Sequence, residues 1–225
     1  MMSWNAKLHA PGRVLPIALA AAAAMALALP AHADTVSVPP VPFNIKVGDG
    51  FIPFLVGHAD GSQNYVCLPT STGGVAYTLF TPEAVLSNDD GKQLITHFFS
   101  PNPFEPNTNP ALFAVGPIRA TWQHSKDTSA VWGLVKPPTP ENPLGDASTD
   151  PKFVAKNAIA WLKVTATGSQ NGPEGGDILT NTKFIQRLNT AGGAAPSTGC
   201  STLADVGHLA FVPYTADYFF YRSAD

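Results

Sequence analysis

Charged residues are scarce in this sequence. Asp, Glu, Lys and Arg make up only 13% of the 225 residues, about half the usual share of ~25%. The Lys and Arg residues are scattered and form no basic run, and the formal net charge is −3. Nucleic acids and anionic membranes are bound through clustered Lys and Arg, so the sequence disfavours both as partners. Apolar residues reach 44%, which argues against an intrinsically disordered chain.

Long apolar runs are also rare, and the clearest one lies at the N-terminus. Lys7 and Arg13 precede an apolar stretch over residues 14–29, which a small-x-small sequence ending at Ala33 follows. These are the three parts of a secretory signal peptide. The stretch is shorter than the ~20 residues that span a membrane. We therefore expect residues 1–33 to be a signal peptide cleaved near Ala33, and the mature protein to be secreted or periplasmic without a membrane span.

Cysteine occurs only twice, as Cys67 and Cys200. In the oxidising compartment that an export signal implies, two such cysteines can pair. A catalytic thiol or a pair of metal ligands is the alternative, but neither cysteine has a Cys-x-x-Cys partner or a nearby His. The sequence therefore predicts a structural disulfide between Cys67 and Cys200.

Proline and glycine are abundant, with 22 and 19 residues, and helix interiors tolerate neither well. Between the turn-forming segments lie short stretches rich in β-branched and aromatic residues, which are typical of strands. The predicted strands are Gln63–Leu68, Val75–Phe80, Lys92–Phe99, Arg119–His124, Ala130–Lys136, Ala158–Thr167, Asp177–Leu188 and Phe211–Arg222. This spacing predicts an all-β fold, an antiparallel β-sandwich or barrel of about eight strands.

The rest of the chain is organised around these strands. Residues 34–60 begin with a Pro-rich stretch and form an N-terminal lead-in, so we expect one β-rich domain over residues 61–225. Two long Pro-rich loops, Ser100–Pro117 and Pro137–Pro151, interrupt that domain. Loops of this length are often binding loops or lids.

Several motifs follow one another in an order that resembles a known family. They are Gly61-Ser62-Gln63-Asn64-Tyr65-Val66-Cys67, His97-Phe98, Ala120-Thr121-Trp122-Gln123, the run from Asp127 to Gly133, the run from Phe184 to Gly193, and the run from Pro213 to Tyr218. Over about residues 60–222 the chain resembles the domain of unknown function 3455 family of secreted bacterial and fungal proteins. It departs from the family pattern by an insertion between Ser100 and Arg119 and by Ala120 in place of a proline. The resemblance implies secretion and carries no settled activity.

Motifs for familiar chemistry are missing. The sequence contains no Gly-x-Ser-x-Gly elbow, no phosphate-binding loop, no His-Glu-x-x-His pair and no Gly-x-Gly-x-x-Gly turn between a strand and a helix. The four histidines after the predicted signal peptide, His58, His97, His124 and His208, are far apart in sequence. We therefore predict neither a metal nor a cofactor, although strand-borne histidines can converge in space.

His97 is the first candidate for a site residue. Alternation places it on an apolar face with Ile95 and Phe99. A core histidine that makes one hydrogen bond is one interpretation. The other is a pocket that His97, Trp122 and Trp132 form at the end of the sheet beneath the Pro-rich loops, with flat rings for a sugar or an aromatic ligand.

Arg187 and Asp217 are the second pair of candidates, because both lie in apolar predicted strands. A buried cation needs an acid, so an ion pair between the two strands is the structural interpretation, and an Arg clamp for a carboxylate ligand is the functional one. We expect a secreted protein that binds a small molecule or an extracellular polymer without catalysis. The alternatives are a secreted hydrolase or metal-dependent enzyme with a site near His97, and a structural cell-surface protein.

Overall fold

The computed structural model describes residues 36–101 and 118–224. The predicted signal peptide and most of the first Pro-rich loop lie outside these residues. The described part contains two short 3-10 helices, η1 (Phe43–Ile45) and η2 (Leu203–Asp205). Its strands are β1 (Phe51–Pro69), β2 (Val75–Ser87), β3 (Gln93–Pro101), β4 (Ile118–His124), β5 (Ala130–Val135), β6 (Ala147–Ser148), β7 (Trp161–Gln170), β8 (Phe184–Gly192) and β9 (Leu209–Ser223).

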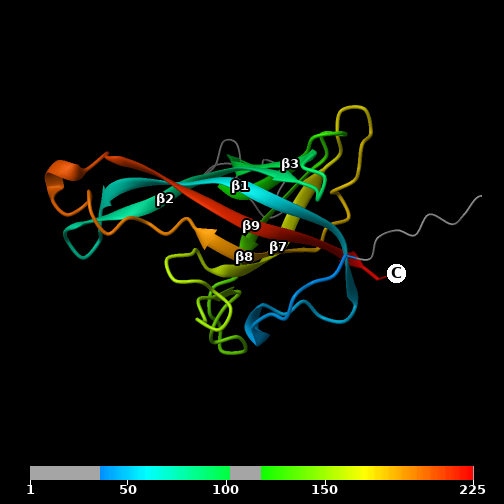
Figure 1. The fold of residues 1–225 in the computed structure, drawn as a ribbon, viewed down its shortest axis with the longest axis horizontal. Coiled ribbons are helices and arrows are strands. Elements are labelled where there is room, and N and C mark those ends of the chain that lie inside the picture. The colour runs from blue at the N-terminus through cyan, green and yellow to red at the C-terminus, as the bar shows by residue number, and fades with distance from the viewer. Residues whose placement is uncertain (1–35, 102–117, 225) are drawn as a thin grey trace, which may run out of the picture. The chain divides into compact units, whose positions relative to one another are not determined.

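Eight of these strands close into an antiparallel barrel. The hydrogen-bonded order is β5-β4-β3-β2-β1-β9-β8-β7, and β5 pairs back onto β7. Figure 1 shows β9 running between β1 and β8. The all-β prediction is confirmed, and the β5–β7 pairing decides between sandwich and barrel. In the described part of the chain, no helix is long and apolar enough to cross a membrane.

The predicted strands are all present, but their boundaries differ. β1 begins at Phe51 and so takes in residues that the sequence assigns to the lead-in. The alternation of apolar and polar residues in β1 is interrupted by Pro53, Gly57 and Gly61. The strand is therefore hard to recognise from the sequence, because proline and glycine are not typical of a strand interior. Residues 177–183 precede β8 and include a turn at residues 178–181. The two-residue β6, which pairs with the start of β7, lies within the second Pro-rich loop and has no pattern to reveal it.

The barrel interior holds the main core. Strand β9 shows how it is built: Tyr214, Ala216, Tyr218 and Phe220 alternate along one face and all are buried inside the barrel core. Side chains of successive strand residues point to opposite faces of the sheet, so this alternation places them together. The interior is therefore lined by aromatic and aliphatic residues from most of the strands.

The lead-in covers the outer face of β8 and β9. A second buried cluster there contains Ile45, Val154, Trp161, Leu188, Phe219 and Tyr221. The side chain of Gln186 donates a hydrogen bond to the Ile45 carbonyl at 2.6 Å, and Asn44 donates to the Ala147 carbonyl at 2.8 Å. Strand β9 is thus covered on both sides, which explains why both of its faces are aromatic.

The predicted disulfide between Cys67 and Cys200 is present. It joins the end of β1 to the loop before η2, with 5.5 Å between the two Cα atoms. A disulfide forms and persists in an oxidising environment, so the pair points to an extracellular compartment.

Candidate ligand pocket inside the barrel

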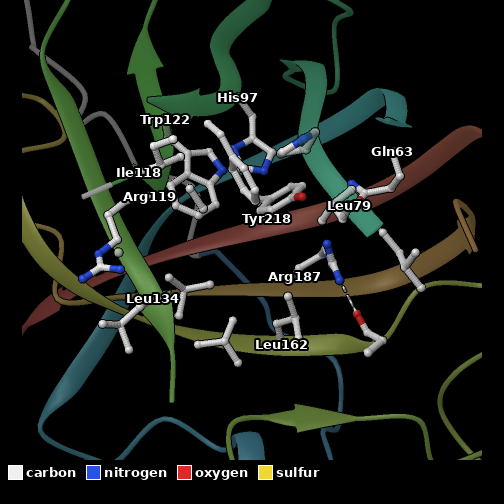
Figure 2. A pocket seen from close by; sticks show the side chains of 18 of the residues that line it. Gln63, Leu79, His97, Ile118, Arg119, Trp122, Leu134, Leu162, Arg187 and Tyr218 are labelled. Carbon is white, nitrogen blue, oxygen red and sulfur yellow. Dashed lines mark hydrogen bonds between the residues drawn. The ribbon is translucent and has the colours of Figure 1, made fainter. Parts of the chain in front are cut away.

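The barrel encloses a cavity of about 420 Å³. Sites for small molecules typically measure about 300–1,000 Å³ and are mostly apolar. This cavity fits that description, because aliphatic residues of β4, β5 and β7 line one side and His97, Trp122 and Tyr218 line another (Figure 2). Ile118, which is 65% exposed, lies on its lining at the start of β4 and marks where the apolar surface reaches solvent.

His97 is buried in the wall of this cavity. Its Nδ1 lies 2.9 Å from the Thr121 carbonyl oxygen, which can only accept, so Nδ1 carries the proton. The imidazole stacks on the Trp122 indole, with 4.3 Å between the ring centroids and 7° between the planes. Burial lowers the pKa of His97 to about 3; the bond to Thr121 opposes this shift and the charge of Arg187 adds to it. His97 is therefore neutral at physiological pH.

Arg187 reaches into the same cavity from β8 (Figure 2). Its Nε and Nη2 both donate to the Ala160 carbonyl, at 3.2 and 2.9 Å. Among the described residues, no carboxylate pairs with it. Its charge lowers the pKa of Tyr65 and of Tyr214 against the effect of burial, and it lowers the pKa of His97 in the same direction as burial. Arg187 is thus a cation in a largely apolar cavity, and within the described part of the chain its hydrogen bonds go to one carbonyl.

The predicted ion pair between Arg187 and Asp217 is wrong. Arg187 is the register partner of Tyr218 on β9, whereas Asp217 is the partner of Leu188. Neighbouring residues of a strand point to opposite faces, so Arg187 points into the barrel and Asp217 points out of it. The carboxylate of Asp217 instead contacts His58 and Asn189.

The structure brings only some of the candidate residues together. His97, Trp122 and Arg187 all line the cavity. Trp132 is buried but does not line it, and its indole packs against Gly168 of β7. Asp217 belongs to a groove on the outside of the barrel.

Residues that the sequence did not single out complete the wall. Gln63, Tyr65 and Tyr218 line the cavity, and the Tyr65 hydroxyl donates to the Gly193 carbonyl at 2.6 Å. Gln63 and Tyr65 belong to the Gly61–Cys67 motif and share one face of β1. Alternation within that motif predicts that Gln63 and Tyr65 share a face, but it does not predict whether that face points into the barrel, because this depends on the partner strands.

Metal-ligating groups do not gather in this region. Within residues 36–101 and 118–224, no group of three or more His, Cys, Asp or Glu side chains could hold a metal ion. Among the described residues, the polar side chains in the lining are Arg187, Arg119, His97 and a few neutral ones.

The fold and the cavity define a class: a closed antiparallel β-barrel with an internal pocket large enough for a small molecule. The comparison with known families then places the chain. It belongs to the family described as "Protein of unknown function (DUF3455)", whose model matches residues 50–222. No curated protein and no solved structure has detectable similarity to the chain.

Proposed function

We propose that this is a secreted, non-catalytic binding protein that holds a small, largely apolar ligand inside its barrel. The observation that carries the proposal is the cavity of about 420 Å³ with aliphatic and aromatic walls. Apolar surface left open in a folded interior is costly unless a ligand covers it, and cavities of this size and lining are the usual form of small-molecule sites.

The state of His97 favours binding over hydrolysis. A general base acts best when its pKa lies near the working pH, whereas burial lowers the pKa of His97 to about 3. The Nδ1–H of His97 donates to the Thr121 carbonyl, and not to a carboxylate that would orient and activate the ring. The imidazole acts here as a neutral, stacked part of the wall.

Secretion is supported by two independent features. The N-terminal sequence carries the three parts of a signal peptide, and Cys67 is bonded to Cys200. We therefore place ligand capture in the periplasm or outside the cell, after removal of the first 33 residues.

The test uses a neutral apolar fluorophore, N-phenyl-1-naphthylamine, on the mature protein. Its fluorescence should rise on binding, and Ala120→Phe, which adds a ring to the cavity lining, should abolish that rise. Val85→Phe is the matched control, because Val85 is exposed on β2 and does not line the cavity. Absence of binding in the wild type, or equal binding by Ala120→Phe, would refute the proposal. Native mass spectrometry of protein purified from its own compartment then identifies any retained ligand.

A further inference from the structure

The lining of the cavity is unusual in its charge. Among the described residues that line the cavity are two arginines, Arg119 and Arg187, and no aspartate, glutamate or lysine, although acidic residues outnumber basic ones in the chain as a whole. Figure 2 shows the two arginines on different sides of the cavity, on β4 and β8. His97 is neutral, so the charge in this part of the cavity is that of Arg187.

Some of the N–H donors of Arg187 make no hydrogen bond to the described residues. A guanidinium carries five N–H donors in a planar fork. Nε and one N–H of Nη2 point to the same edge, and the Ala160 carbonyl occupies that edge. The other edge, formed by Nη1 and Nη2, makes no hydrogen bond to a described residue. Two parallel N–H groups on one edge match the two oxygens of a carboxylate.

The surroundings of Arg187 strengthen its interaction with a carboxylate. A cation surrounded by low-dielectric walls interacts with an anion more strongly than one in water. Leu162 of β7 and Tyr218 of β9 flank Arg187 in the cavity, and no described acid competes for it. Most of the other residues in the cavity wall are apolar, so the wall favours a ligand whose remaining atoms are hydrocarbon.

From these observations we infer that the ligand is an apolar monocarboxylate, whose carboxylate binds the free edge of Arg187 and whose hydrocarbon part fills the barrel. This inference rests on the proposed binding function and names its ligand class. Two sources share this chemistry: alkanoic acids and aryl-substituted acids. The stacked His97 and Trp122 rings favour the aryl body, and the aliphatic residues of β5 and β7 favour the alkyl chain.

The experiment compares each acid with its neutral amide. Decanoate, decanamide, 3-phenylpropanoate and 3-phenylpropanamide compete against bound N-phenyl-1-naphthylamine near neutral pH. Each acid should bind the wild type on the order of 10- to 100-fold more tightly than its amide, because charge-assisted hydrogen bonds are replaced by neutral ones. The relative affinities of decanoate and 3-phenylpropanoate distinguish the two sources.

Three variants test whether Arg187 is responsible. Arg187→Gln should remove the preference for acid over amide. Arg187→Lys, which keeps the charge but loses the fork, should retain part of the preference. Arg222→Gln is the matched control, because Arg222 is exposed on β9 and lies outside the cavity; its preference should equal that of the wild type.

The outcomes separate this inference from the proposed function. If the fluorophore binds but the wild type does not prefer the acids, or Arg187→Gln keeps the preference, the carboxylate inference is overturned and the binding function stands. If neither the fluorophore nor any competitor binds, both fail. Should Arg187→Gln not fold, the acid-to-amide ratios of the wild type and Arg187→Lys decide the matter.

Discussion

His58 and Asp217 face each other across the β1–β9 pair, with 2.6 Å between Nδ1 and Oδ1. The second oxygen of Asp217 accepts a hydrogen bond from Asn189 on β8 at 2.7 Å. On the other side of the imidazole, Nε2 lies 2.9 Å from Asp89 Oδ1 in the turn between β2 and β3. His58 thus joins three segments on the outer surface of the barrel, and Asp217 is its principal partner.

Because of this contact, the free energy of unfolding should depend on the protonation of His58, and the size of that dependence should depend on Asp217. The hydrogen bond to Asp217 raises the pKa of His58 above 6.5; partial burial opposes the shift and Asp89 adds to it. The resulting stability is fully present below pH 6.5 and is lost as the pH rises through the folded-state pKa. Urea unfolding at about pH 6 and about pH 9 should therefore show a larger loss in the wild type than in Asp217→Asn. Asp60→Asn is the control, because Asp60 is an exposed residue on β1, the strand of His58; it should lose as much stability as the wild type. Equal losses in all three proteins would contradict the prediction.

His97, which is buried in the cavity wall, should affect stability in the opposite direction. Burial lowers the pKa of His97 to about 3, so between pH 6.5 and 3 the unfolded chain binds a proton that the folded protein does not. Stability is then present above pH 6.5 and is lost as the pH falls. His97→Gln, which can still donate to the Thr121 carbonyl, should lose less stability on acidification than the wild type. His208→Gln, at a largely exposed histidine, should behave like the wild type. If His97→Gln loses as much stability on acidification as the wild type, the pH dependence does not come from His97.

Gly61 should tolerate no side chain, for a steric reason. A Cβ atom there would overlap with the carbonyl oxygen of Glu83 and with the Cα of Ala84 on the paired strand β2. We expect Gly61→Ala to lower the free energy of unfolding by about 1–3 kcal/mol. Gly50→Ala meets nothing within 4 Å and should change it by less than about 0.5 kcal/mol. Thermal or urea melts check both variants, and equal effects would mean that β1 and β2 can separate to admit the methyl group.

The disulfide should supply a large share of the stability. It joins residues that are 133 positions apart, and closing so long a loop in the unfolded chain is worth about 4–5 kcal/mol in the chain-entropy model. The paired Cys67→Ser and Cys200→Ser variant should therefore unfold at a much lower urea concentration than the oxidised wild type. Reduction of the wild type should reproduce that shift, and a reductant should leave the serine variant unchanged. Peptide mapping without reduction should recover the Cys67–Cys200 linked peptide.

Much of the local structure could be predicted from sequence, because alternation and turn residues act over short distances. The eight predicted strands and their succession along the chain follow from such patterns. Closure of the barrel could not, because pairing between β5 and β7 joins segments with no common pattern. The same limit applies to Trp132: its strand was predicted, but the choice between the two faces of β5 depends on the partner strands.

The Arg187–Asp217 pair shows the physical origin of this limit. The sequence places both residues in neighbouring strands, which is correct. Because side chains alternate with a period of two, a register that differs by one residue moves a side chain to the other face of the sheet. Hydrophobicity does not reveal the difference here, since β9 is aromatic on both faces. Register therefore decides which partner each residue has, and it places Arg187 inside the barrel, where no acidic residue of the described ranges pairs with it.

A double-mutant cycle should show that Arg187 and Asp217 are independent. If they formed a buried pair, removing one partner would cost about 3–5 kcal/mol and the double variant would recover part of the loss. Since their side chains lie on opposite faces of the sheet, the effects of Arg187→Met and Asp217→Asn should add to within about 0.5 kcal/mol in urea melts. Arg187→Met alone should cost at most about 1 kcal/mol, because it gives up hydrogen bonds to one carbonyl while placing an apolar side chain in an apolar cavity. A coupling above about 1 kcal/mol would contradict the observed register. A small cost for Arg187→Met together with lost carboxylate binding would mean that the guanidinium is kept for the ligand, because the fold itself does not require it.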